Sequence, residues 1–231
     1  MADAAADDLD GLIRRVDPDR WLTSRFIADP AARADVVALY AYDHELARAR
    51  RIASTPLLAE IRLTWWREAL DEIFAGGPVR RHPVAEALAA AVRRHDLPRQ
   101  PLEAMIDGQI AALEVPALDE AAAVAWADAV QGSLARLAGR VLDPSAEPDA
   151  VAAAGRGWGL ALLIRAGAVT RQTATPPLRA ALAVARAARF SVAALPAALP
   201  ARLARFDLAG RTPGPLGKRL RLFLAAATGR V

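Results

Sequence analysis

Residues 30–53 read PAARADVVALYAYDHELARARRIA, and their apolar positions recur every three or four residues. That spacing places the apolar side chains on one face of a helix, whereas a strand would alternate at every second residue. Pro30 suits the first turn of a helix, because the amide hydrogen that it lacks would have no partner there. The stretch therefore predicts a long amphipathic helix. Its apolar positions are Val36, Val37, Leu39, Tyr40, Leu46 and Ile52.

The same helical spacing continues along the chain, and no segment alternates as a strand would. Helices are predicted at residues 56–74, 83–95, 98–113, 119–141 and 149–169. A strong stop, Gly76-Gly77-Pro78, follows the first of them. After Arg171 the chain is rich in proline, so two or three short helices are expected there. The sequence predicts an all-α fold, organised as one helical bundle.

The composition indicates one domain. The 231 residues are 54% hydrophobic, which is enough for a sizeable core. The absence of cysteine excludes disulfides and thiolate metal sites, and a cytoplasmic location is expected. No run of about 18 apolar residues is free of charge, so no membrane-spanning helix is expected. Residues 1–12 are acidic and rich in alanine, and we expect them to form a disordered tail before a helical domain at residues 13–231.

Charge is distributed unevenly along the chain. Residues 1–150 carry 17 basic and 25 acidic side chains, whereas residues 151–231 carry 13 basic side chains and a single acid, Asp207. Such a basic region favours an acidic protein partner or an anionic membrane surface. Nucleic acid is the least expected partner, because the region has neither interleaved aromatic residues nor a known reading motif. Compositional bias explains the pattern equally well, since nearly all the basic residues are arginine.

Carboxylates four residues apart on a helix can hold Mg²⁺ at a bound diphosphate. Glu68 and Glu72 have this spacing and follow two tryptophans on a predicted helix. Arg62 and Arg67 are near enough along that helix to pair with them, so a solvated, salt-bridged face is the simpler explanation. The three histidines have no metal-ligand spacing. The glycines at residues 155–159 lie in a helical context and indicate close helix packing rather than a phosphate loop.

Several motifs, in a fixed order, carry a family resemblance. Residues 38–42 (ALYAY), 60–70 (EIRLTWWREAL) and 157–160 (GWGL) are similar to signatures of the squalene/phytoene synthase family. The resemblance is strongest over residues 17–170 and fades after Arg171. It implies a single-domain, all-α bundle of the isoprenoid synthase type, here truncated at the C-terminus and ending in irregular basic helices at residues 172–231.

Enzymes of this family join two isoprenoid diphosphates head to head, with Mg²⁺ held by two aspartate-rich motifs on facing helices. Where the resemblance places the first motif, residues 43–51 read DHELARARR; where it places the second, residues 163–171 read LIRAGAVTR and contain no acid. A basic side chain cannot ligate Mg²⁺, and without the metal the leaving diphosphate is not neutralised. These departures imply a non-catalytic relative. Its arginines can still bind an isoprenoid diphosphate directly.

The degenerate pattern most resembles the branch of the family that includes the mitochondrial complex I assembly factor. That resemblance implies an assembly or scaffold factor whose helical cavity and basic face bind an acidic protein partner. The residues expected to contact an anion or partner are His44, Glu45, Arg48, Arg51, Arg62, Trp65, Trp66, Arg67 and Arg165. Core packing is the alternative role for at least one of the two tryptophans, since adjacent residues on a helix point about 100° apart.

Two other functions stay open. One is a Mg²⁺-dependent prenyl-diphosphate transferase that uses displaced acids, which requires Asp43, Glu45, Glu68 and Glu72 to converge in one cavity. The other is a peripheral membrane or isoprenoid-lipid binding protein that uses its C-terminal arginines at the inner face of the membrane. No cofactor is expected, and Mg²⁺ enters only with the transferase.

Overall fold

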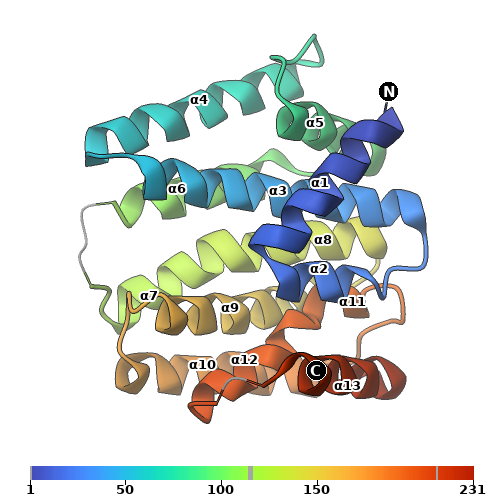
Figure 1. Cartoon of the computed structure of the whole chain (residues 1–231), viewed down its shortest axis with the longest axis vertical. Helices are drawn as coiled ribbons and strands as arrows, with labels where there is room; N and C mark the ends of the chain where they lie inside the picture. Colours follow the sequence, from blue (N-terminus) through green and yellow to red (C-terminus); the bar gives the residue numbers. More distant parts are fainter. Residues whose placement is uncertain (1, 114–116, 212) are drawn as a thin grey trace.

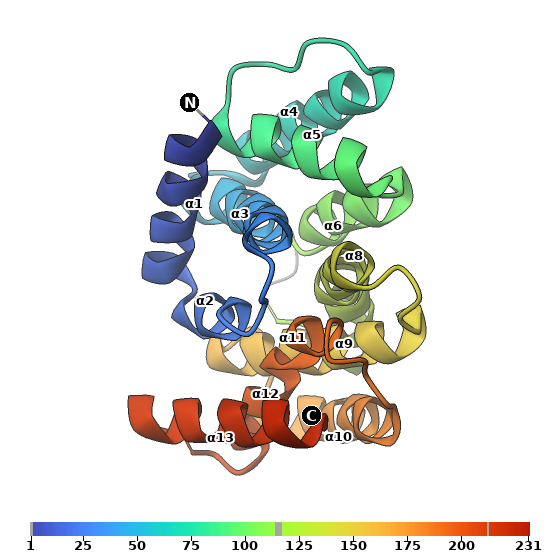
Figure 2. The same cartoon turned by 90° about the vertical axis from the view of Figure 1, so that its right-hand side faces the viewer.

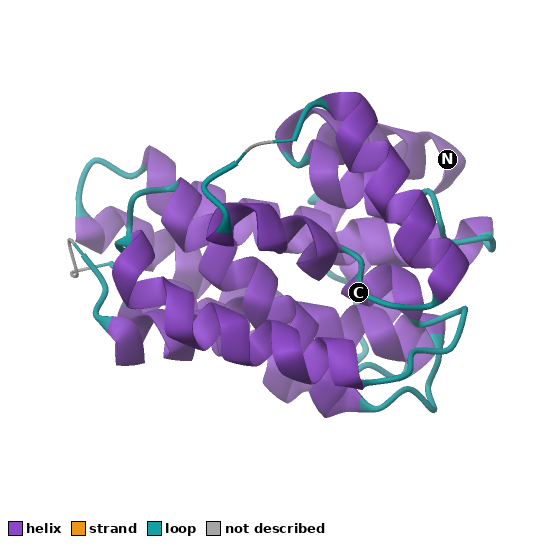
Figure 3. Ribbon diagram, turned by 90° about the horizontal axis from the view of Figure 1, so that it is seen from below, coloured by secondary structure: helices purple, strands orange, loops and turns teal. Residues whose placement is uncertain are grey.

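The computed structural model describes residues 2–113, 117–211 and 213–231, with side chains from residue 8 onward. Its regular elements are all helices (Figure 1; Figure 3), so the all-α prediction is confirmed for these residues. In chain order they are α1 (Ala2–Val16), α2 (Pro18–Ser24), α3 (Pro30–Ile52), α4 (Pro56–Ala75), α5 (Pro83–His95), α6 (Arg99–Ala111), α7 (Glu120–Trp126), the π-helical η1 (Ala127–Gly132), α8 (Ser133–Leu142), α9 (Pro148–Arg165), α10 (Arg171–Ala187), α11 (Leu195–Ala198), α12 (Pro200–Leu208) and α13 (Pro215–Thr228).

Helix α3 begins where its sequence predicts. The carboxylate of Asp29 accepts hydrogen bonds from the amides of Ala31 and Ala32, at 3.0 and 3.4 Å, and Pro30 is the first helical residue. Residues 35–43 are buried, because α1, α4, α5 and α8 pack around this helix. Figure 2 shows α3 nearly end-on between α1 and α6. The predicted amphipathic helix is thus enclosed on several sides. Its buried apolar residues belong to a hydrophobic cluster, which we call the first cluster.

Local signals also set the boundaries of α4 and α5. The hydroxyl of Thr55 caps α4 by accepting a 3.3 Å hydrogen bond from the amide of Leu58. Gly76 ends the helix with a φ of 74°, a conformation that glycine adopts without steric cost. Helix α5 occupies the predicted range from Pro83 to His95.

Residues 2–12, which the sequence predicts to be part of a disordered tail, belong to helix α1 in the structure. Leu9 and Ile13 lie four residues apart, so they share one face of the helix and are buried in the first cluster. The carboxylate of Asp10 accepts a 2.9 Å hydrogen bond from the indole of Trp21 and pairs with Arg25. The acidic composition concealed a short apolar stripe that is sufficient to dock the helix on α3.

The predicted helix at 119–141 is continuous but passes through the π-helical segment η1, which lies against α9. Glycine makes this close approach possible. A Cβ atom on Gly155 would lie 2.6 Å from the Cβ of Ala135, and one on Gly159 would lie 2.9 Å from Cγ of Gln131. The prediction that these glycines serve close helix packing is confirmed.

After Arg171 the structure departs from the expectation of two or three short helices. Four helices follow within the described residues, and α10 alone has 17 residues with Pro176 and Pro177 inside it. The two prolines remove two backbone hydrogen bonds in its second turn. Burial of one face of α10 against α9 offsets this loss. The buried residues of α10 are Ala174, Leu178, Ala181, Leu182 and Ala185.

Helix α9 joins the two halves of the bundle. It packs against η1 and α8 on one side and against α10 and α12 on the other, where a second hydrophobic cluster gathers. In Figure 1 the helices form a stack, with α4 and α5 at one end and α10, α12 and α13 at the other. In the part of the chain that the structure describes, no helix combines the length and hydropathy needed to cross a membrane.

We expect Gly155→Ala to lower the free energy of unfolding by about 1–3 kcal/mol, because the added methyl group meets packed neighbours on η1 and α8. Urea unfolding followed by circular dichroism measures the change. The matched control is Gly217→Ala on α13, where the nearest neighbour of an added Cβ is the Cβ of Pro213 at 3.6 Å. Equal stability of the Gly155→Ala protein and the wild type would contradict the role given to this glycine.

Candidate functional site

A groove between α3 and α4 brings together five of the nine candidate residues. We call it the α3–α4 groove; its volume is about 340 Å³. It is lined by Glu45, Arg48, Ala49, Ile52, Ile61, Arg62, Trp65, Trp66 and His82. The two helices are consecutive and joined by a short turn, so the facing positions of one helical hairpin form this surface.

Aromatic rings form the floor of the groove. The rings of Trp65 and Trp66 meet edge to face with centroids 5.0 Å apart, and the ring of His82 lies 5.4 and 5.2 Å from them. Trp66 is only 3% exposed and also meets Tyr42 at 5.3 Å, which confirms core packing for one tryptophan. The Nδ1 atom of His82 is buried without a hydrogen-bond partner among the described residues. A ligand that donates or accepts at this atom would satisfy it.

Two arginines border the groove, and only one of them is in an ion pair with a described residue. The guanidinium of Arg48 binds Glu45 at 3.2 Å. Arg62 is exposed and forms no ion pair with any residue that the structure describes. Ile52 and Ile61, which also line the groove, are exposed to solvent, as are Leu57 and Leu58 in the first turn of α4. The groove can therefore take an apolar segment with an acidic group beside it.

Glu68 and Glu72 are held by Arg80, not by the expected Arg62 and Arg67. The guanidinium of Arg80 donates to Glu72 at 2.7 Å and to Glu68 at 3.3 Å, and it covers the ring of Trp65 at 4.6 Å. These side-chain hydrogen bonds lower the pKa of Glu72 below its ordinary value. The salt-bridged face was correctly predicted, but its cation comes from the loop before α5, which helix spacing could not indicate.

Asp43 lies in a different place, within a buried cluster that we call the Arg20 cluster: Arg20, Asp43 and Gln131. The guanidinium of Arg20 donates to Asp43 at 2.7 Å and also contacts Gln131, whose amide donates to Asp43 at 3.1 Å. Arg20 is 4% exposed and Asp43 7%. Burial alone would lower the pKa of Arg20, but attraction to Asp43 and Asp17 raises it, so Arg20 stays charged.

Little free space remains at this cluster. The cavity between Arg20, Tyr40, Gln131 and Trp158 has a volume of about 10 Å³. Binding pockets for small molecules have volumes of about 300–1,000 Å³. The side chains of the Arg20 cluster and its neighbours therefore fill this part of the bundle interior.

Arg165, expected across the cavity from the first motif helix, does not line the α3–α4 groove. It belongs to a second ionic group, the Asp19 cluster: Asp19, Arg165, Asp207 and Lys218. Arg165 binds Asp207 twice at 2.9 Å and Asp19 at 3.3 Å, and its guanidinium lies 4.6 Å above the ring of Trp158. Lys218 binds Asp19 at 2.5 Å. Helix α2 thus contacts both helices that carry the motif positions. Asp19 pairs with Arg165 of α9, and Arg20 pairs with Asp43 of α3.

Three further candidates lie outside the groove. Arg67 binds Asp107 at 2.7 Å on a solvent-exposed surface. Burial lowers the pKa of the half-buried His44, and the nearby Arg51 contributes in the same direction. Arg51 itself is exposed.

Among the described residues, the acids that a displaced-acid transferase would use do not converge in one cavity. Asp43 binds Arg20, whereas Glu68 and Glu72 bind Arg80. No group of three or more His, Asp or Glu side chains in the described part of the chain is arranged to hold a metal ion. Asp43 and Glu45 lie on α3 and pair with Arg20 and Arg48, whereas Glu68 and Glu72 lie four residues apart on α4 and share Arg80.

The sequence did not indicate the partners that bind these acids: Arg20, Arg80 and Gln131. Arg20 and Gln131 lie 23 and 88 residues from Asp43, and Arg80 lies 8 residues from Glu72. The one local signal was that Arg20 follows Asp17 and Pro18 at a helix start, where Asp17 accepts a 3.0 Å hydrogen bond from the Arg20 amide.

Comparison with known proteins identifies the fold. The family model for squalene/phytoene synthase matches residues 13–167. A crystal structure of a dehydrosqualene synthase in complex with ligand superimposes with a TM-score of 0.73 at 12% identity, covering 98% of this chain and 97% of that chain. The squalene synthase HpnC from Alicyclobacillus acidocaldarius gives 0.71 at 14% identity, covering 99% and 95%. The isoprenoid synthase fold is confirmed, and the match includes the helices after Arg171.

Curated relatives match a shorter part of the chain. The "NADH dehydrogenase (ubiquinone) complex I, assembly factor 6" proteins of Bos taurus and Homo sapiens are 34% and 32% identical to it over 97 residues. Each match covers 42% of this chain and 28% of the relative. The expected resemblance to this branch is confirmed over that segment.

We expect Arg20→Ala to lower the free energy of unfolding by about 3–5 kcal/mol, because it leaves the carboxylate of Asp43 buried without its cation. Adding Asp43→Asn should recover part of this loss, since the buried charge is then gone. Urea unfolding of both single variants and the double variant measures the coupling.

The control is Arg67→Ala, which breaks an exposed pair and should cost no more than about 1 kcal/mol. Simple additivity of Arg20→Ala and Asp43→Asn would show that the two side chains do not depend on each other in the folded protein.

Proposed function

The chain belongs to the squalene/phytoene synthase family, and we propose that within this family it is a non-catalytic assembly or scaffold factor for a respiratory NADH dehydrogenase. The observation that carries the proposal is the Arg20 cluster. The acid at the start of the first motif position, Asp43, is occupied by an arginine and an amide from the same chain.

Head-to-head condensation of prenyl diphosphates makes a demand that these residues do not meet. A leaving diphosphate has to be neutralised by Mg²⁺, and carboxylates have to hold that ion. Asp43 is already paired with the cation of Arg20, and the second motif position carries Arg165, itself paired with two aspartates. The space of about 10 Å³ beside the Arg20 cluster is far below the volume of a prenyl chain. These features favour a structural role for the bundle interior.

The α3–α4 groove supplies the surface that such a factor needs. It combines an aromatic floor, exposed aliphatic side chains at its rim and the exposed cation of Arg62. A partner segment that places an apolar side chain on Trp65 and a carboxylate at Arg62 would bury the first and pair the second. We therefore propose that the partner is a protein segment with apolar and acidic residues side by side. The names of the curated relatives support an assembly role for this interaction.

In cells that lack this chain, we expect less assembled NADH dehydrogenase on native gels, and we expect the wild-type chain to restore it. The double variant Ile61→Asp, Arg62→Glu should leave assembly near the level of the deficient cells, because it reverses the charge and polarity of the groove. Both side chains are exposed, so the fold should persist. Thermal unfolding of the purified variant checks this.

The matched control is Arg93→Glu, an exposed arginine on α5 outside the groove, which should restore assembly fully. Normal assembly in the deficient cells, or full restoration by the groove variant, would contradict the proposal.

We also expect the purified chain to release no diphosphate from farnesyl or geranylgeranyl diphosphate in the presence of Mg²⁺. Asp43→Asn and the double variant Arg62→Ala, Glu68→Ala serve as comparison proteins in a coupled assay for diphosphate. Release by the wild type that these substitutions abolish would establish a prenyl-transferring enzyme and end the non-catalytic assignment.

A further inference from the structure

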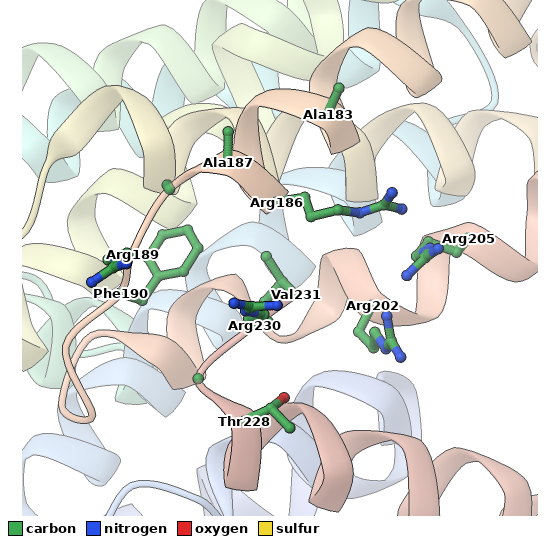
Figure 4. Close-up of a pocket in the computed structure, with 12 residues that line it drawn as sticks. Ala183, Arg186, Ala187, Arg189, Phe190, Arg202, Arg205, Thr228, Arg230 and Val231 are labelled. Carbon is green, nitrogen blue, oxygen red and sulfur yellow. The ribbon is translucent and has the colours of Figure 1, made fainter.

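The opposite end of the molecule carries a basic cavity that the proposed function does not use. We call it the arginine pocket, and its volume is about 1310 Å³. It lies between α10 and the end of α13, with α12 beside it (Figure 4). The charged residues that line it are Arg186, Arg189, Arg202, Arg205 and Arg230.

Among the described residues, no acidic side chain pairs with the arginines of this pocket. None of the side chains that line it is acidic. Asp207, the only acid after residue 150, faces Arg165 instead. Burial lowers the pKa of Arg202, and repulsion from Arg186 and Arg221 lowers it further. A multiply charged anion in the pocket would relieve this repulsion.

Helix α13 beside the pocket presents an apolar stripe to solvent. We call it the α13 stripe: Leu216, Leu220, Phe223 and Leu224, which are 79, 60, 62 and 48% exposed. Their spacing places them on one face of the helix, while Leu222 and Ala225 are buried on the other. Arg219 and Arg221, both exposed, flank the stripe. An apolar face bordered by arginines is typical of helices that lie in a membrane interface.

The pocket and the stripe belong to one end of the molecule. Figures 1 and 2 both place α10 and α13 together at the end farthest from α4 and α5. The arginine pocket includes Thr228 and Arg230, at the end of the same helix that carries the stripe. One surface can therefore engage both features at once.

We propose that this end of the molecule binds an anionic phospholipid membrane, with the α13 stripe at the boundary of headgroups and acyl chains and a lipid phosphate in the arginine pocket. Charge complementarity selects this partner, because residues 151–231 carry 13 basic side chains and one acid. The apolar stripe adds a contact that a free phosphate ion would not use. The assignment is independent of the assembly role and of the α3–α4 groove.

Co-sedimentation with vesicles tests the proposal. We expect the chain to bind vesicles made of equal parts phosphatidylcholine and phosphatidylglycerol, to bind weakly to phosphatidylcholine alone, and to lose affinity as salt is added. Arg202→Ala with Arg205→Ala should weaken binding about 10- to 30-fold, since each basic residue near such a surface contributes about a factor of five. Leu220→Ser with Phe223→Ser should weaken it by about tenfold or more.

Controls come from the other end of the molecule. Arg93→Ala and Leu57→Ser remove an exposed arginine and an exposed leucine there and should bind as the wild type does. Equal loss in these controls would overturn the proposal, because the effect would then follow net charge or hydropathy alone.

Two further results would also overturn it. Inorganic pyrophosphate that raises the melting temperature, without any vesicle binding, would assign the pocket to a free anion. A dimer that forms without vesicles and dissociates on Leu220→Ser with Phe223→Ser would assign the stripe to a second copy of the chain. Sedimentation equilibrium and thermal unfolding measure these outcomes.

Discussion

Two consecutive charged residues on a seven-residue helix hold the two halves of this bundle in register. Arg20 of α2 binds Asp43 of α3 and contacts Gln131 of η1, while Asp19 binds Arg165 of α9 and Lys218 of α13. Both residues are buried, and a buried charge without its partner is costly. Because these pairs form only when five elements dock together, the ionic contacts of α2 favour one arrangement of the helices over its alternatives.

We propose that the same contacts keep this chain from carrying out the reaction of its family. Mg²⁺ and a diphosphate would need free carboxylates and open space between the motif helices. Here arginines neutralise the available acids, and side chains fill the interior beside the Arg20 cluster. The surfaces suited to binding lie instead at the two ends of the stack, where the α3–α4 groove and the arginine pocket present very different chemistry. We propose that the fold serves here as a scaffold, with a protein partner bound at one end and a membrane at the other.

The fold was predictable wherever its signals are local. Proline at a first turn, a capping side chain and a glycine stop act within a few residues, so the ranges of α3, α4 and α5 follow from the sequence. Two local signals predicted something other than the structure shows. The acidic composition of the first residues predicted a disordered tail, although Leu9 and Ile13 are buried. The prolines of α10 predicted a break, although the helix continues through them and packs on α9. Burial against a distant helix decided both.

The sequence by itself determined that this protein is all-α and resembles a known family, and that residues 163–171, where the resemblance places the second motif, contain no acid. The family resemblance also supplied five of the nine residues that line the α3–α4 groove: Glu45, Arg48, Arg62, Trp65 and Trp66. Only the tertiary structure decided which cation neutralises each acid. An ion pair depends on the distance between side chains in space, and residues such as Asp19 and Arg165 are 146 positions apart along the chain. Helical periodicity fixes the face on which a residue lies, but the partner on that face is chosen by how the helices pack.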